Sequence, residues 1–133
     1  KKKEEKSMSI GGAEFSQKAE GDVLSVRIEG EVDHHSAVSL REEVDREILE
    51  VRPKRLELDL SGVSFMDSSG IGLIMGRYNL MKELEGELVV AKTGPATERI
   101  LRLAGLDRMV QINDGNAAKN ERRAGNGRQK RKI

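Results

Sequence analysis

Residues 55–84 read RLELDLSGVSFMDSSGIGLIMGRYNLMKEL, and within this stretch a strand pattern is followed by a helical one. Leu56, Leu58 and Leu60 alternate with acidic residues, which is typical of a strand that is covered on one face only. From residue 70 to residue 84 the apolar side chains form two stripes at helical spacing. We therefore expect a half-covered strand that leads directly into the most buried helix of the chain.

The segments before and after this stretch continue the alternation of strands and helices. The further elements that we expect are a hairpin of AEFSQKA and VLSVRI, a helix over 36–51, a strand ELVVA, a helix over 94–105 and a short strand MVQI. Pro53 ends the first of these helices, while Pro95 and Gly105 mark the start and the end of the last. This order predicts a single α/β domain in which an N-terminal hairpin precedes repeated α–β units. Its sheet should be mixed and mostly parallel, with helices chiefly on one face.

Length and charge indicate one folded domain with basic ends. The chain has 133 residues, of which 36% are hydrophobic, and a net charge of +1. We expect a flexible leader over 1–11, the folded domain over 12–113 and a basic, disordered tail over 114–133, because the tail has almost no apolar side chains to bury. Since both ends are basic, the body between them is acidic.

The composition also excludes several classes of function. The sequence has no cysteine, so it offers neither disulfides nor thiolate metal sites. An acidic body with two Phe, one Tyr and no Trp has neither the basic face nor the stacking side chains of a nucleic-acid-binding protein. No apolar run is long enough to span a membrane, and no signal peptide is recognisable. We therefore expect a cytoplasmic protein without direct nucleic acid or membrane partners.

Two loops carry the polar residues that are candidates for a site. GEVDHHSA follows the second expected strand, and SGVSFMDSSG follows the third. Both loops leave the carboxyl ends of parallel strands, where ligand and partner sites of such sheets gather. If the two strands are neighbours, Asp33 and Ser68 must lie near one another.

The glycines and serines after the third strand fit known catalytic and nucleotide-binding sites poorly. Gly70, Gly72 and Gly76 do not follow the dinucleotide-binding spacing, and two glycines one turn apart more simply let a neighbouring element approach closely. A serine hydrolase needs a G-x-S-x-G turn, which is absent. His34 and His35 are the only histidines, and their adjacent side chains diverge. We expect no catalysis, no cofactor and no metal site.

The entry to the second helix leaves two interpretations open. Asp67 and Ser68 stand where backbone N–H groups lack internal partners and where the helix dipole favours negative charge. A plain helix cap explains both residues, just as a cap by Asp33 or a neighbour explains the DHH sequence. A phosphorylated serine would also be tolerated at this place, because helix N-termini bind phosphate readily, and a kinase could reach it.

GEVDHHSA together with FMDSSGIGLIMGRY resembles the STAS domain family, in particular its anti-sigma factor antagonists from endospore-forming bacteria, over about residues 12–112. The resemblance implies a non-enzymatic switch in sporulation that binds an anti-sigma factor, itself a serine kinase, and thereby displaces a sigma factor. It also implies that this kinase inactivates the protein by phosphorylating Ser68, and that a metal-dependent serine phosphatase restores the active form. We expect a monomer when the protein is free. The partner-binding residues implied by the resemblance are Asp33, His34, Asp67, Ser68, Ser69 and Gly70.

Other roles within and outside the family remain open. STAS domains also serve as scaffold components of stressosomes and of lipid or anion transport systems. A small hydrolase or nucleotide-binding enzyme that uses Ser68 is a third alternative. The sequence departs from the family at its carboxyl end, where members usually finish with an apolar helix and this chain is polar and basic. That departure concerns the last helix and not the switch.

Overall fold

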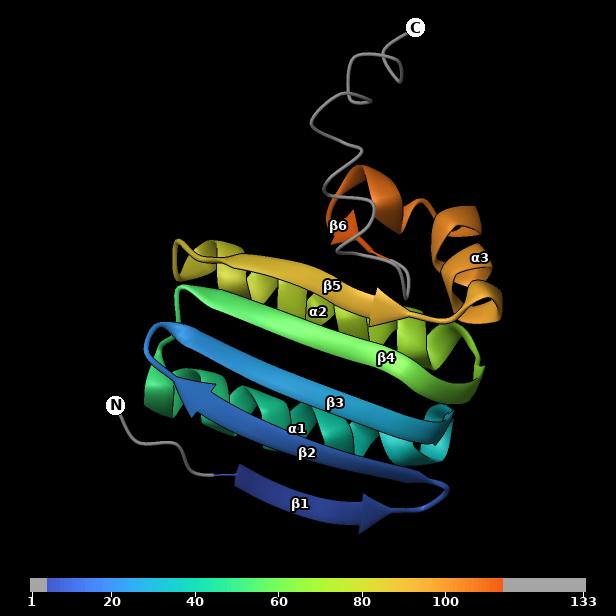
Figure 1. Cartoon of the computed structure of the whole chain (residues 1–133), viewed down its shortest axis with the longest axis horizontal. Helices are drawn as coiled ribbons and strands as arrows, with labels where there is room; N and C mark the ends of the chain where they lie inside the picture. The colour runs from blue at the N-terminus through green and yellow to red at the C-terminus, as the bar shows by residue number, and fades with distance from the viewer. Residues whose placement is uncertain (1–4, 114–133) are drawn as a thin grey trace, which may run out of the picture.

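The computed structural model describes residues 5–113 of the chain as strands and helices that alternate as expected (Figure 1). In chain order the elements are β1 (Glu5–Ile10), β2 (Ala13–Glu20), β3 (Val23–Val32), α1 (His34–Val51), β4 (Arg55–Met66), α2 (Ser68–Glu83), β5 (Glu87–Thr93), α3 (Pro95–Leu103), the 3-10 turn η1 (Leu106–Arg108) and β6 (Gln111–Ile112). Pro95 starts α3, and Gly105 follows its end with a φ of 83°. These ends agree with the prediction.

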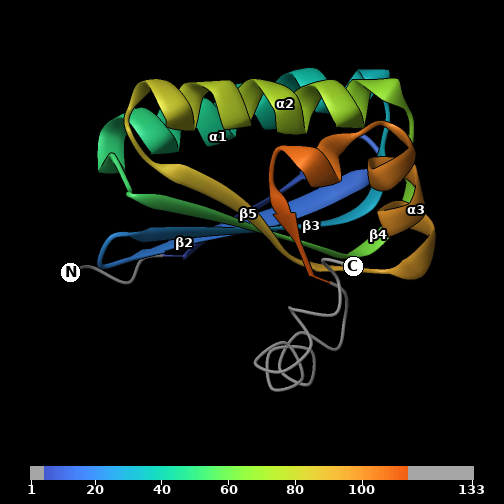
Figure 2. The same cartoon turned by 90° about the horizontal axis from the view of Figure 1, so that it is seen from above.

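The strands form one sheet in which every strand lies beside its neighbour in the sequence, from β1 to β6. The first three strands pair antiparallel, whereas β3, β4, β5 and β6 pair parallel. Figure 2 shows α1 and α2 over one face of the sheet and α3 at the end where β4 and β5 finish, while no described helix covers the opposite face. The predicted mixed sheet with one-sided helices is confirmed.

The hydrophobic core lies between the covered face of the sheet and the two long helices. Leu56, Leu58 and Leu60 of β4 are 0%, 3% and 1% exposed, so the alternation in the sequence located the core correctly. The helical side chains that close over them are Leu40, Val44, Ile48, Leu73, Ile74 and Met81. α1 and α2 bury five residues each. Because α2 has 16 residues and α1 has 18, α2 is the more buried helix only by a small margin, and the two helices share one face of the sheet.

β3 and β4 extend beyond the rest of the parallel sheet at their carboxyl ends. Pairing of β4 with β5 ends at Leu60 and Thr93. Pairing of β4 with β3 continues, through two register shifts, to Val32 and Met66. The last part of β4 therefore has a strand on one side only, and the two loops of interest leave from this projecting end.

The expected flexible leader is wrong over part of its length, because residues 5–10 form the edge strand β1. Its six residues pair antiparallel with β2 from Lys18 to Ala13. Sequence reasoning missed this strand because its side chains are exposed except for the half-buried Ile10, so no hydrophobic pattern identifies it. The backbone ladder holds the strand. The tail over 114–133 lies outside the described residues, and the domain limits at 12 and 113 stay predictions.

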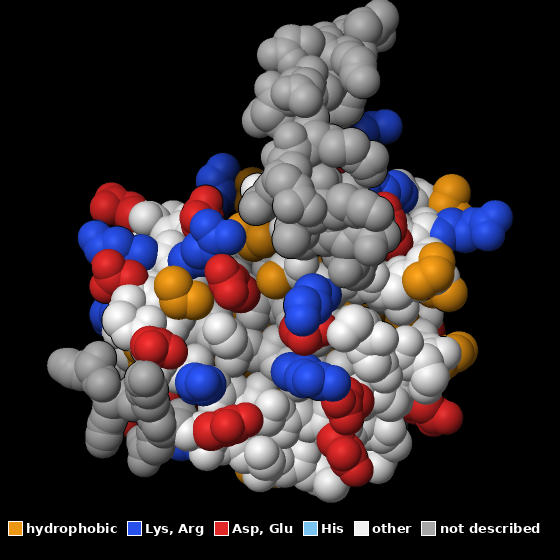
Figure 3. Space-filling model, viewed as in Figure 1, with side chains coloured by type: hydrophobic (Ala, Val, Ile, Leu, Met, Phe, Trp, Pro, Cys, Tyr) orange, Lys and Arg blue, Asp and Glu red, His pale blue; other side chains and the backbone are white. Residues whose placement is uncertain are grey.

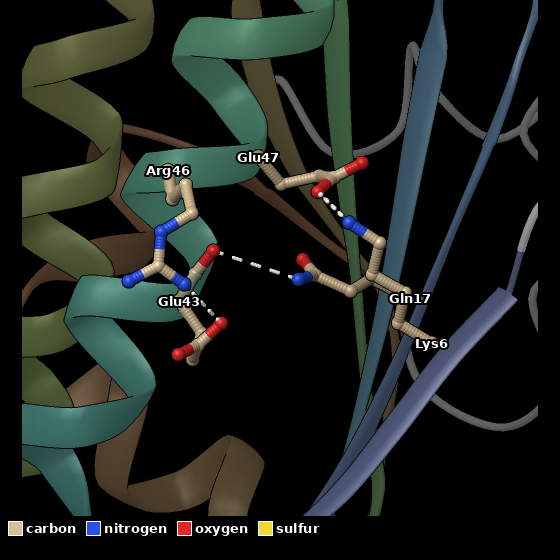
Figure 4. Close-up of polar contacts among 5 residues, drawn as sticks. All are labelled: Lys6, Gln17, Glu43, Arg46 and Glu47. Atoms are coloured by element: carbon tan, nitrogen blue, oxygen red, sulfur yellow. Dashed lines mark hydrogen bonds and ion pairs between the residues drawn. The ribbon is translucent and has the colours of Figure 1, made fainter.

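Polar contacts join the antiparallel strands to α1 (Figure 4). Lys6 Nζ of β1 lies 3.0 Å from Glu47 Oε1. Gln17 of β2 is buried, and its Nε2 donates over 3.5 Å to the backbone carbonyl of Glu43. On the helix, Arg46 Nη1 pairs with Glu43 Oε1 at 2.7 Å. These contacts fix the edge of the sheet to the helix that begins at the candidate site.

The glycines of α2 do not have the role that their spacing predicts. A Cβ built on Gly72 or Gly76 meets no atom within 4 Å, so no element of the described structure approaches them closely. A Cβ on Gly70 would instead overlap Met66 Cγ and lie 2.9 Å from its sulfur. Gly70 is thus required where β4 turns into α2, whereas Gly72 and Gly76 are not required by packing among the described residues.

We expect Gly72→Ala to raise the free energy of unfolding by about 0.5–1 kcal/mol, because alanine in a helix interior retains less conformational freedom in the unfolded chain and its methyl group meets nothing here. Chemical denaturation monitored by circular dichroism measures the change. Gly70→Ala is the matched control and should destabilise the protein. A loss of stability in Gly72→Ala would show that α2 is packed more closely than the structure describes.

A partly buried ion pair between the two long helices was not foreseen from the sequence. The side chain of Arg77 on α2 is 8% exposed, and its Nε lies 2.8 Å from Asp45 Oδ1 on α1. Its Nη1 also donates to the carbonyl of Leu73 at 3.2 Å. Burial lowers the pKa of Arg77, and the neighbouring Asp45 opposes that shift. The pair fixes α1 against α2, and both helices begin at the candidate site.

Candidate functional site

The two predicted loops meet at the projecting end of β3 and β4. Val32 and Met66 are register partners on these neighbouring parallel strands. The backbone N–H of Asp67 donates to the carbonyl of Val32 at 3.3 Å. Asp33 and Asp67 follow these partners directly, so α1 and α2 begin next to each other. The inference that the DHH and DSSG loops are adjacent is confirmed.

Asp33 caps α1 through reciprocal hydrogen bonds with Ser36. Its Oδ1 accepts from the backbone N–H of Ser36 at 3.0 Å, and its own N–H donates to Ser36 Oγ at 3.2 Å. Ser36 is fully buried, and its hydroxyl also donates to the carbonyl of Glu31 at 3.1 Å. The hydrogen bond from the Ser36 N–H is the main cause that lowers the pKa of Asp33 below its ordinary value. The capping interpretation of the DHH sequence is confirmed.

We expect Asp33→Ala to lower the thermal unfolding midpoint at pH 7, and the difference from wild type to close as the pH falls below about 4. The pKa of this carboxyl is lower in the folded protein. Its stabilisation is therefore complete above the unfolded pKa and is lost as the pH falls through the folded pKa. Unfolding midpoints between pH 7 and pH 3 check this. Asp33→Asn keeps a capping acceptor without titrating and is the control; a pH-independent difference for Asp33→Ala would contradict the account.

Asp67 caps α2, and Ser68 is the first helical residue. Asp67 Oδ1 accepts from the backbone N–H of Ser69 at 2.8 Å, and its carbonyl accepts from the N–H of Gly70 at 2.9 Å. Ser68 is exposed, and its hydroxyl has no hydrogen-bond partner among residues 5–113. Ser69 is half-buried one position further into the helix. The hydroxyl of Ser68 is thus the accessible one of the two.

The remaining predicted residues take different positions around this point. Gly70 is buried against Met66 and serves the turn of the backbone. His34 is exposed at the first position of α1. We call the surface around the ends of β3 and β4 and the first residues of α1 and α2 the rim. His34 lies on this rim, as Ser68 does, and can face a partner, whereas Gly70 has no side chain to offer.

Sequence reasoning missed the contribution of the β1–β2 turn to this rim. The N–H of Glu31 donates to the carbonyl of Gly12 at 2.9 Å. A Cβ built on Gly11 would lie 3.3 Å from Cδ2 of His35. The adjacent glycines mark a turn in the sequence, but only the folded hairpin brings that turn to the beginning of α1.

The uncovered face of the sheet carries charges of both signs. Figure 3 shows Lys and Arg side chains interspersed with Asp and Glu across this face. Arg27 pairs with Glu29 at 2.6 Å, and Arg55 pairs with Glu57 at 2.9 Å. Among the described residues, these pairs place opposite charges next to each other on this face.

The described part of the chain has neither a metal-ligand cluster nor a membrane-spanning helix. Among residues 5–113, no group of three or more His, Cys, Asp or Glu side chains is arranged to hold a metal ion. No helix in the same range is long and apolar enough to cross a membrane. What the site does offer is an exposed serine hydroxyl at a helix entry, beside two capping carboxylates.

Comparisons with known proteins agree with this geometry. The family model of the STAS domain matches residues 15–119. The anti-sigma F factor antagonist of Paenibacillus polymyxa is 39% identical over 92 residues, which are 69% of this chain and 79% of that protein. The anti-sigma-B factor antagonist of Bacillus subtilis is 32% identical over 89 residues, 67% of this chain and 80% of that protein. A solved structure of the anti-sigma factor antagonist SpoIIAA in its unphosphorylated form matches with a TM-score of 0.67 at 23% identity, covering 83% of this chain and 96% of that one.

Proposed function

Because this chain belongs to the STAS domain family, we propose that it is an anti-sigma factor antagonist whose activity is controlled by phosphorylation of Ser68. In its unphosphorylated form it binds an anti-sigma factor, and that binding releases a sigma factor. The observation that carries the proposal is the exposed hydroxyl of Ser68 at the first position of α2.

The names of the relatives support this role over that of a scaffold or transport component. Both relatives described above are antagonists of anti-sigma factors, one of the sigma F system and one of the sigma B system. Both names describe a protein that counteracts an anti-sigma factor. The role in sporulation is a more specific proposal, which follows the sigma F relative. Like its relatives, the protein acts by binding and not as an enzyme.

The geometry suits Ser68 as the acceptor in phosphoryl transfer. Its oxygen attacks the γ-phosphorus of a nucleotide held by the kinase, the bond to the β-phosphate bridging oxygen breaks, and the serine proton passes to a base or water in the kinase site. Positioning is the main requirement for this reaction. The cap by Asp67 fixes the first turn of α2 and thereby positions Ser68. The capping hydrogen bond comes from the Ser69 N–H and does not involve the Ser68 hydroxyl.

Phosphorylation should change the surface and not the fold. It adds about −1.5 to −2 charges at neutral pH. The N-terminus of α2 tolerates a dianion because of its free N–H groups and its dipole. In the complex, the same dianion would stand beside Asp67 and close to the nucleotide phosphates of the kinase. The complex should therefore dissociate, and a metal-dependent serine phosphatase would restore binding.

Phosphopeptide mapping tests the proposal. The protein is incubated with the purified anti-sigma factor of the same organism and ATP, and the modified residue is identified by mass spectrometry. The expected result is phosphate on Ser68. Ser69→Ala, which leaves Ser68 in place, should be phosphorylated like the wild type. Phosphate on Ser69 alone, or none on this peptide, would contradict the proposal. Two further expectations are a cytoplasmic location and a monomeric free protein. Fractionation of host cells checks the location, and light scattering of the purified protein checks the oligomeric state.

A further inference from the structure

We propose that Phe65 is the apolar anchor by which the protein docks on the kinase beside Ser68, an inference that rests on the proposed function. The chain has two Phe, one Tyr and no Trp. Phe15 is 4% exposed and belongs to the core. Phe65 is 51% exposed, although large apolar side chains are usually buried.

Phe65 lies on the rim from which Ser68 projects. Its neighbour Met66 and the register partner of that residue, Val32, are buried toward the helices. Because successive side chains of a strand point to opposite faces, Phe65 and its own partner Glu31 point to the uncovered face. Phe65 precedes Ser68 by three residues, so their Cα atoms are at most about 11 Å apart. One partner surface can reach both.

Neighbouring groups leave about half of the Phe65 side chain exposed. β4 has no strand beside it here on the β5 side, because that pairing ends at Thr93. On the β3 side, the carboxylate of Glu31 lies over Gly12, since a Cβ there would be 2.9 Å from its Oε1. The stem of Glu29 lies over Gly62 in the same way, 2.8 Å from such a Cβ. Two glycines thus receive the acidic side chains that could otherwise fold over the aromatic ring.

The core does not require this residue. Val63 and Met66 supply the contacts of this part of β4 with the hydrophobic core. An aromatic side chain that is left exposed at the edge of a functional rim is typical of binding hot spots, which are enriched in large, rigid side chains at the centre of an interface. Burial of such a ring on binding favours the complex through its apolar area.

The surroundings of Phe65 indicate the kind of surface that receives it. Glu31, Asp33 and Asp67 lie on the same rim, at the end of β3 and at the caps of α1 and α2. A complementary partner has an apolar pocket rimmed by Lys or Arg side chains, next to the site where phosphate is transferred. Charge complementarity of this kind accelerates association and fixes the orientation of the partner.

The test compares Phe65→Ala and Phe65→Leu with wild type. The purified anti-sigma factor of the same organism is used to measure the Kd of the unphosphorylated complex and the KM and kcat for phosphorylation of Ser68. Leu49→Ala is the matched control, because Leu49 is 50% exposed but lies about 22 Å along α1 from its start. We expect Phe65→Ala to raise Kd and KM about tenfold or more. Phe65→Leu should retain most of the affinity, and Leu49→Ala should bind like wild type.

The outcomes separate this inference from the proposed function. Unchanged Kd and KM in Phe65→Ala, with normal phosphorylation of Ser68, would overturn the anchor and leave the switch intact. Equal weakening by Leu49→Ala would overturn it as well. A wild-type dimer in light scattering that Phe65→Ala dissociates, with kinase binding unchanged, would assign the ring to self-association instead. If wild type neither binds nor is phosphorylated, both proposals fail. The unfolding midpoint of Phe65→Ala should equal that of wild type, and a fall of many degrees would assign the residue to the core.

Discussion

Replacing Gly30 with alanine should lower the free energy of unfolding by about 2–4 kcal/mol. Gly30 has a φ of 89°, which residues with a Cβ adopt only under strain. A Cβ at this position would also overlap the carbonyl oxygen of Gly12, and backbone cannot move aside as a flexible side chain can. That same oxygen accepts the hydrogen bond from the N–H of Glu31. The substitution therefore forces the β1–β2 turn away from the end of β3.

Chemical denaturation of Gly30→Ala beside Gly21→Ala measures this effect. Gly21 has a φ of 63°, but a Cβ on it would meet no atom within 4 Å. Gly21→Ala therefore reports the backbone strain alone, and the excess loss in Gly30→Ala reports the clash with Gly12. Equal losses in the two variants would mean that the turn does not press on β3 as described.

Replacing Ser68 with aspartate should weaken binding to the anti-sigma factor by about a hundredfold or more, which is the size expected for an unpaired charge within an interface. The carboxylate would stand beside Asp67 at the first turn of α2, where it imitates part of the charge of a phosphoserine. Ser68→Ala should bind like wild type and accept no phosphate. Both variants should keep the fold, since the cap of α2 comes from Asp67 and not from Ser68.

Isothermal titration of the anti-sigma factor with each variant checks this prediction. Circular dichroism establishes that the helices are retained. Ser69→Asp is a control for position, because Ser69 is half-buried one residue further into the helix. If Ser68→Asp binds with wild-type affinity, negative charge at this position is not the basis of the switch.

The sequence was sufficient to predict the parallel part of the fold and the core of the site. Side chains of a strand alternate between its two faces, so the alternation of Leu56, Leu58 and Leu60 with acidic residues shows which face of β4 is covered. The adjacency of Asp33 and Asp67 also follows from local patterns, because neighbouring parallel strands end at the same edge. Their capping roles were correct for the same reason, since a cap depends on residues three positions apart or fewer.

Features that depend on contacts between distant elements could not be predicted. β1 has no apolar alternation, so only its ladder with β2 defines it. Arg77 and Asp45 are 32 residues apart, and nothing in either helix marks them as partners. The glycines of α2 were assigned to close packing from their spacing, whereas the one that packing requires is Gly70, whose constraint comes from Met66. The exposure of Phe65 likewise follows from where β5 ends, which its own segment does not reveal.

Release of sigma factor from a preformed complex tests the central claim most directly. A complex of fluorescently labelled sigma factor with its anti-sigma factor is titrated with this protein, and fluorescence anisotropy follows the release. The account predicts that the unphosphorylated protein and Ser68→Ala free the sigma factor, while protein phosphorylated on Ser68 does not. Release that is equally efficient with the phosphorylated protein, or no release with the unphosphorylated one, would contradict it.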